Sequence, residues 1–121
     1  MKSLGLDIKK SIKDTMPWGY YIILGEGDGY KSKFIHVDAG HKLSYQRHKF
    51  RSEHWFILSG FPSVIINGEK RVMLEGQSID IKAGELHRIE ALNTPVEFIE
   101  VQTGTYFGED DIERIDDDYG R

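Results

Sequence analysis

The sequence predicts an all-β domain, and three observations support this fold class. After residue 17 we expect about nine short strands, and turn residues separate them at intervals of roughly 8–12 residues, as in sandwiches and barrels. Asn67-Gly68 stands between two of these strands and predicts a tight hairpin turn. The stretch at 25–29 opens no helix and so does not predict a phosphate-binding loop. The expected strands are 18–24, 30–37, 43–48, 52–59, 62–66, 69–74, 78–81, 86–92 and 95–102.

Two short segments are expected to be helical. Leu4, Ile8 and Ile12 have helical spacing, so residues 4–13 predict a short amphipathic helix. The stretch at 108–114 predicts one helical turn, because acidic residues gather at its start. We therefore expect an N-terminal arm over 1–15 and a single domain over 16–121.

Composition excludes several classes of protein. A hydrophobic content of 39% predicts a folded chain, and no apolar run is long enough for a membrane span. There is no cysteine, which excludes disulfides and thiol nucleophiles and suits a cytoplasmic location. The N-terminus lacks the apolar core of a signal peptide. No basic stripe is present, so nucleic acid is not an expected partner, and the acidic stretch at 108–121 predicts a solvated surface.

The decapeptide "QRHKFRSEHW" at 46–55 concentrates groups that bind metals. Gln46 and His48 are two apart on one expected strand, so their side chains point to the same face. Glu53 on the next strand can face the same interior, and His87 begins another strand after a glycine turn. Two imidazoles, a carboxylate and an amide oxygen suit Mn, Fe, Co, Ni or Zn. Four such ligands leave two octahedral positions open for a substrate.

The spacing of these residues and of four glycines forms two motifs. The glycines suit turns that other residues resist. The pattern resembles the cupin family, whose fold is a single-domain double-stranded β-helix, or jelly-roll barrel. Gln46 stands where most cupins have a histidine. The motifs are Gly40, Gln46, His48, Glu53 and Gly60, and then Gly76, Gly84 and His87.

Longer segments resemble one branch of this family. The stretches "PWGYYIIL", "LSYQRHKFRSEHW" and "FIEVQTGTYFGEDDIERIDDDYGR" are similar to the cupin domain of type II mannose-6-phosphate isomerase. In bifunctional relatives this domain follows a mannose-1-phosphate guanylyltransferase domain; here we expect it to stand alone. The resemblance covers 17–121. It implies interconversion of mannose 6-phosphate and fructose 6-phosphate, and one divalent ion, Zn, Mn or Co, on Gln46, His48, Glu53 and His87.

A sugar phosphate also requires cationic groups. Lys31 and Lys33 share one strand face, Arg51 lies within the specific motif, and Arg88 follows His87. We expect all four cations to bind substrate and Arg51 to act in catalysis, since a guanidinium can fork onto a phosphate. The general base is not assigned, although His54 has suitable chemistry.

The chain departs from the family at four positions. Phe34 and Phe50 stand where the family usually has Arg and His, and we expect these rings close to the site. Lys82 and Ala91 stand where Pro and Asn are usual, at a turn and a strand end.

Two other functions remain open beside the isomerase. One is a non-catalytic metal- and sugar-binding cupin, and the other is a different metal-dependent cupin enzyme such as an oxygenase. An isomerase assay, a metal analysis and an oxygen-uptake trace would separate them. We also expect a homodimer, with the 4–13 segment at its interface.

Overall fold

The computed structural model describes residues 13–108 and 110–116. These residues form strands and no helix, which confirms the all-β prediction. The 4–13 helix lies outside the described residues, except for Lys13, which begins the first strand. The strands are β1 (Lys13–Met16), β2 (Gly19–Gly27), β3 (Tyr30–Val37), β4 (Tyr45–Arg47), β5 (Arg51–Ser59), β6 (Ser63–Ile66), β7 (Glu69–Val72), β8 (Ser78–Ile81), β9 (His87–Glu90), β10 (Val96–Gly104) and β11 (Glu113–Asp116).

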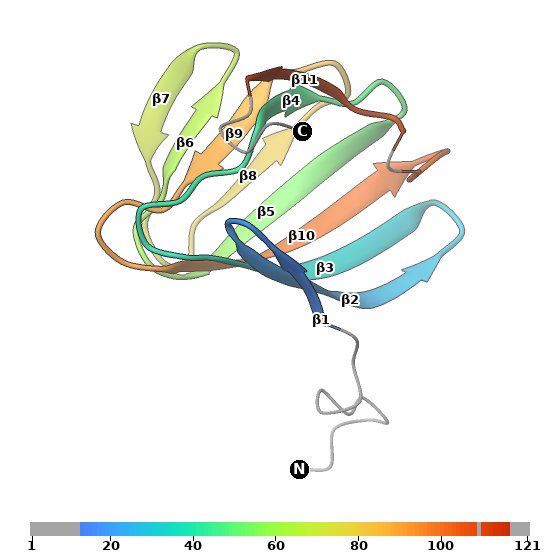
Figure 1. Ribbon diagram of the computed structural model, residues 1–121. Coiled ribbons are helices and arrows are strands. Elements are labelled where there is room, and N and C mark those ends of the chain that lie inside the picture. Colours follow the sequence, from blue (N-terminus) through green and yellow to red (C-terminus); the bar gives the residue numbers. More distant parts are fainter. Residues whose placement is uncertain (1–12, 109, 117–121) are drawn as a thin grey trace, which may run out of the picture.

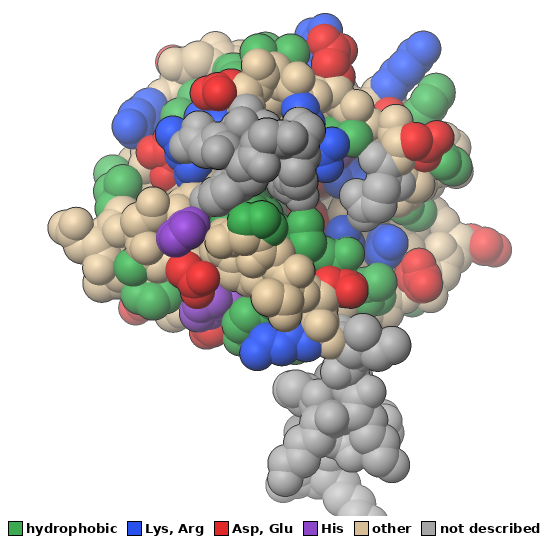
Figure 2. Space-filling model, in the orientation of Figure 1, with side chains coloured by type: hydrophobic (Ala, Val, Ile, Leu, Met, Phe, Trp, Pro, Cys, Tyr) green, Lys and Arg blue, Asp and Glu red, His purple; other side chains and the backbone are tan. Residues whose placement is uncertain are grey.

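The strands form two facing antiparallel sheets. The larger has the order β1-β2-β3-β10-β5-β8 and the smaller the order β11-β4-β9-β6-β7. Figure 1 shows the long strands β3, β10 and β5 below and the short strands β4 and β11 above them. No helix in the described part of the chain is long and apolar enough to cross a membrane. Figure 2 shows the Lys and Arg side chains of this view interspersed with Asp and Glu.

Turns in the chain have the backbone that their sequence requires. Asn67 and Gly68 have φ of 48° and 84°, and Ile66 pairs with Glu69 across them, so the predicted hairpin is confirmed. Gly60 has φ of 87°, and a Cβ there would lie 2.3 Å from the Pro95 oxygen. Only glycine fits such a close approach of two backbones.

The interior has an apolar end and a polar end. Side chains point inward at every second position of a strand, and the type of these inward residues changes along the strands. On β5 the inward side chains change from Arg51 and Glu53 to Trp55 and Ile57. Across the pair, β10 follows the same gradient from Gln102 through Glu100 to Phe98 and Val96. The apolar end is the hydrophobic core, and the polar end holds the candidate site. The core side chains are Trp18, Ile35, Val37, Trp55, Ile57, Val64, Met73, Ile81, Ile89, Ala91, Val96 and Phe98.

The C-terminal acidic stretch is not the helical turn that the sequence predicts. The Asp111 N–H donates to the Gly108 oxygen at 3.0 Å, which closes a tight turn, and the chain then continues as β11. β11 pairs with β4, where the Glu113 carboxylate accepts two hydrogen bonds from Arg47. Asp111 is also buried, so the prediction of a solvated surface is wrong at this residue. The pairing with β4 outweighs the local preference for a helix start.

Candidate metal centre

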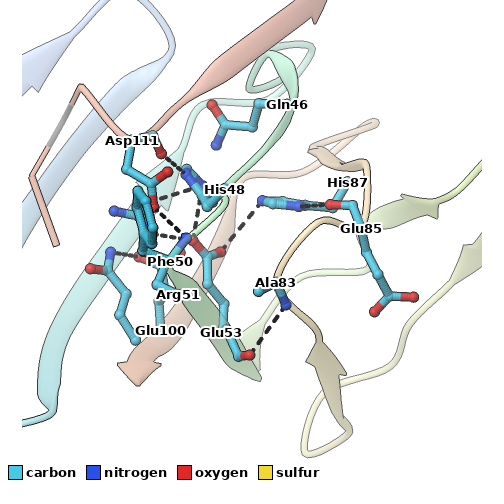
Figure 3. Close-up of polar contacts among 12 residues, drawn as sticks. Gln46, His48, Phe50, Arg51, Glu53, Ala83, Glu85, His87, Glu100 and Asp111 are labelled. Carbon is cyan, nitrogen blue, oxygen red and sulfur yellow. Dashed lines mark hydrogen bonds and ion pairs between the residues drawn. The ribbon is translucent and has the colours of Figure 1, made fainter. Parts of the chain in front are cut away.

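Three buried side chains converge at the polar end of the interior. His48 directly follows β4, Glu53 lies on β5, and His87 begins β9. One ligand atom from each lies within 4.8 Å of the other two, and each residue is no more than 3% exposed. Figure 3 shows the two imidazole rings on either side of the Glu53 carboxylate. The structure therefore brings together three of the four predicted ligands.

Main-chain carbonyls orient both imidazole rings. The Nδ1–H of His48 donates to the Asp111 oxygen at 2.6 Å, and that of His87 donates to the Glu85 oxygen at 2.9 Å. A carbonyl oxygen can only accept, so the proton of each neutral ring is on Nδ1. The Nε2 lone pairs of both rings then face the interior. Metal-binding histidines are commonly held in this way.

The inward-facing lone pairs of the triad face one another. Nε2 of His48 lies 3.1 Å from Glu53 Oε2, and Nε2 of His87 lies 3.5 Å from Glu53 Oε1. The His87 Nε2 atom is buried and has no hydrogen-bond partner. Nitrogen and oxygen lone pairs that face each other at these distances require a cation or a proton between them. The His48, Glu53 and His87 donor set therefore fits a divalent metal ion.

Gln46 lies on β4 directly opposite His87, as the registry of β4 and β9 shows. Its side-chain oxygen accepts a hydrogen bond from the Ser44 hydroxyl at 2.8 Å. The residue is half-buried and lies beside the triad in Figure 3. Its role as a fourth ligand stays a prediction.

Arg51 contacts the triad directly. Its Nε donates to Glu53 Oε2 at 3.0 Å, and its Nη2 donates to His48 Nε2 at 3.0 Å. Arg51 is only 6% exposed, so these hydrogen bonds are shielded from water. A guanidinium therefore uses the same lone pairs that would bind a metal.

The pKa values of the two buried glutamates, Glu53 and Glu100, are shifted in opposite directions. Burial alone raises the pKa of Glu53, but hydrogen bonding and nearby positive charge, including that of the Arg51 guanidinium, outweigh it and hold this pKa well below its usual range. Burial, together with the charge of Glu53, raises the pKa of Glu100 to about 8. Both carboxylates accept from the Trp55 indole N–H, at 3.1 and 3.2 Å. Burial also lowers the pKa of His87, which favours the neutral ring that a metal needs.

A cavity of about 270 Å³ lies next to the triad, between the two sheets. Gln46 and Arg51 form its boundary toward the triad, and its far wall includes aromatic and aliphatic side chains. This volume suits a small polar metabolite. The lining residues are Met16, Trp18, Tyr21, Lys33, Ile35, Leu43, Ser44, Gln46, Arg51, Glu100, Ile112 and Arg114.

The predicted substrate-binding cations have different locations. Lys33 and Arg51 line the cavity, whereas Lys31 and Arg88 are not among its lining residues. The Arg88 guanidinium is buried and donates to the Leu43 oxygen at 2.7 Å and to the Asp116 carboxylate at 3.2 Å. The hydrogen bond to Asp116 joins β9 to β11. His54 is exposed and contacts Asp80 at 2.5 Å, away from the triad.

The structure corrects the prediction that the Phe34 and Phe50 rings lie close to the site. Phe34 lies on the outer face of the larger sheet, opposite Ile22 and Ile99, because inward positions of β3 are the alternate residues. The Phe50 side chain is exposed and packs edge-on against Tyr106, with ring centroids 6.3 Å apart. The structure places neither ring against the triad.

Sequence reasoning missed three residues of the site. Glu100 and Arg114 line the cavity. Asp111 orients His48 through its carbonyl, and its carboxylate accepts from the N–H groups of Lys49 and Phe50 at 2.8 and 2.9 Å. Alternation with Phe98 on one strand could have placed Glu100 inward. No local pattern points to Asp111 or Arg114.

Comparison with known sequences gives one family and several curated relatives. Residues 7–117 match the family described as mannose-6-phosphate isomerase C-terminal. The chain is 42% identical over 106 residues to the mannose-1-phosphate guanylyltransferase ManC of Salmonella typhimurium and to the alginate biosynthesis protein AlgA of Pseudomonas aeruginosa. Each match covers 87% of this chain but only 22% of the relative. The chain thus spans about a fifth of the length of these relatives.

Comparison with solved structures supports the fold. Oxalate decarboxylase from Bacillus subtilis matches with a TM-score of 0.78 and 19% identity, over 91% of this chain and 31% of that chain. KdgF from Halomonas sp. matches with a TM-score of 0.75 and 17% identity, over 83% of this chain and 94% of that chain. These likenesses confirm the cupin fold predicted from the two glycine-containing motifs.

Proposed function

The chain belongs to the family described as mannose-6-phosphate isomerase C-terminal, and on this premise we propose that it is a divalent-metal-dependent sugar-phosphate isomerase. Its reaction would interconvert mannose 6-phosphate and fructose 6-phosphate. The observation that carries this proposal is the convergence of His48, Glu53 and His87 beside a cavity lined by both polar and apolar side chains. A cytoplasmic location and a homodimer are part of the proposal.

The residues of the triad would hold the ion, with Gln46 as the predicted fourth ligand. When bound, a divalent ion would act as a Lewis acid toward the oxygens on C1 and C2 of the sugar. Glu53 supplies one negative charge to the donor set and the imidazoles supply none, so the centre keeps a net positive charge. This charge would favour the enediolate, in which negative charge develops on those oxygens.

Aldose–ketose interconversion also requires a group that takes a proton from C2 and returns it to C1. Glu100 is a carboxyl group that lines the cavity next to Arg51 and Lys33. We assign this proton transfer to Glu100 in the proposed reaction. Arg51 would orient the substrate through its guanidinium, as the sequence predicts.

NMR of the metal-loaded protein with mannose 6-phosphate in deuterated water tests the proposal. We expect fructose 6-phosphate to form, with deuterium at C1, and free mannose to react little. Glu100→Gln should retain the metal but lose both turnover and exchange, and Glu97→Gln, on the outer face of the same strand, is the matched control. Tight binding of the sugar phosphate without turnover would favour the non-catalytic sugar-binding cupin. Oxygen consumption with Fe(II) would favour an oxygenase.

A further inference from the structure

Two cationic side chains from opposite sheets line the cavity away from the triad. Lys33 comes from β3 in the larger sheet, and Arg114 comes from β11 in the smaller sheet. The lining contains these two cations, Arg51 and one carboxyl group, Glu100. Positive groups therefore outnumber negative ones in this wall.

The three cations differ in their surroundings. Arg51 donates to the Glu53 carboxylate at 3.0 Å, so its charge is largely balanced by that ligand. Lys33 is 7% exposed and its ammonium lies 4.4 Å from the centroid of the Tyr21 ring, which holds it at the cavity wall. The charge of Lys33 also acts on the neighbouring Glu100 carboxyl group, where it lowers the pKa that burial raises. Lys33 is therefore held at the cavity wall, where it can contact an anion that enters the cavity.

Strand registry fixes the direction of Arg114. Arg114 pairs with Gln46 across β11 and β4, and Gln46 pairs with His87 across β4 and β9. Directly opposed residues of antiparallel strands point to the same face, so the three side chains form one row that faces the interior. Adjacent strands are about 4.8 Å apart, which places Arg114 roughly 10 Å from His87. This separation is similar to the length of an extended six-carbon sugar with a terminal phosphate.

We propose that Lys33 and Arg114 form an anion subsite that binds the phosphate of the substrate, while the triad lies at the other end of the sugar chain. This inference rests on the proposed function for its choice of a sugar phosphate. It assigns a role to Arg114, a residue outside both motifs. It also explains why cations of the two sheets meet at one cavity. A phosphate group can accept charge-assisted hydrogen bonds from both an ammonium and a guanidinium.

Calorimetric titration of the metal-loaded protein with inorganic phosphate, mannose 6-phosphate and mannose tests the subsite. Arg114→Gln should weaken binding of both phosphate compounds by at least about 10-fold, because a charge-assisted hydrogen bond is lost, and should leave the affinity for mannose unchanged. Arg114→Lys should restore part of the affinity. Arg71→Gln is the matched control, because Arg71 is an exposed arginine on β7, the opposite edge strand of the same sheet.

The outcomes separate the subsite from the proposed reaction. Weaker phosphate binding in Arg114→Gln, without any isomerase activity in the parent protein, would support the subsite and contradict the proposed function. Normal phosphate affinity in both Arg114→Gln and Lys33→Gln, with turnover intact in the parent, would overturn the subsite alone. Where turnover is present, Arg114→Gln should raise KM for mannose 6-phosphate more than it lowers kcat. Melting curves of the variants would show that each is folded, and because Arg114 is exposed, its variants test the subsite even where Lys33→Gln does not fold.

Discussion

Replacing Arg51 with alanine should tighten metal binding. Arg51 donates one hydrogen bond to His48 Nε2 and one to Glu53 Oε2, and these are the lone pairs that a metal would use. A lone pair cannot serve both, so metal binding has to displace at least the contact with His48. A hydrogen bond to a charged group contributes about 1.5–3 kcal/mol. Removing this competitor should lower the metal Kd by about 10- to 150-fold.

The same substitution should destabilise the metal-free protein. Without the guanidinium, the Glu53 carboxylate stays buried and loses a charge partner, which typically costs about 3–5 kcal/mol. Metal binding would then restore that charge balance. The metal-induced rise in Tm should therefore be larger in Arg51→Ala than in the parent protein.

Competition against a chromophoric chelator measures the Kd, and calorimetry with and without metal measures the Tm. Lys49→Ala is the control, because Lys49 is an exposed cation two residues earlier whose ammonium lies 5.4 Å from the Phe50 ring centroid. Unchanged or weaker metal affinity in Arg51→Ala would refute the competition between Arg51 and the metal. Turnover of mannose 6-phosphate should fall in this variant, whatever its metal affinity.

Four further predictions concern the other residues around the triad. His87→Ala removes one of two imidazoles, so elemental analysis should show metal falling from about one ion per chain to a small fraction. Gln46→His should retain metal with a changed metal preference and Gln46→Leu should weaken binding; unchanged affinity in Gln46→Leu would show that Gln46 is not a ligand. Asp111→Ala removes the acceptor for two backbone N–H groups, so unfolding should become easier by about 1–3 kcal/mol, whereas Asp110→Ala should change stability little. The pKa of Glu100 is raised to about 8, so its protonated form contributes stability that is fully present below about pH 4 and is lost as the pH rises through 8. In urea unfolding, the free energy of unfolding of Glu100→Gln should therefore rise relative to that of the parent protein between about pH 5 and pH 9.

The strand arrangement could be predicted because its determinants are local. Asn67 and Gly68 specify a tight turn by their own backbone preferences, and alternation along β5 places Glu53 and Trp55 on one face. The triad could be predicted because the two motifs preserve the spacing of its residues. Strand alternation alone could not separate Lys31 from Lys33, since both lie on the same face of β3 at different depths. The structure distinguishes them, because Lys33 lines the cavity and Lys31 does not.

The C-terminal part of the site could not be predicted from local patterns. β11 pairs with β4, and the hydrogen bond from His48 to the Asp111 oxygen joins residues that are 63 positions apart. An acidic stretch with no apolar periodicity resembles a solvated surface unless its partners are known. Here the partners are Arg47, Arg88 and the N–H groups of residues 49 and 50. These partners come from β4, β9 and the turn after β4, so Asp111, Glu113 and Asp116 have structural roles.

The position of His48 therefore depends on the docking of the C-terminal strand. β4 has only three residues and shares one residue pair with β9, so β9 alone holds it weakly. β11 adds three further pairs, a two-hydrogen-bond contact between Arg47 and Glu113, and the carbonyl that orients the His48 ring. A metal ion on His48 would in turn favour the ring orientation that Asp111 provides. Metal binding and docking of β11 should thus stabilise each other, since each is stronger when the other is in place.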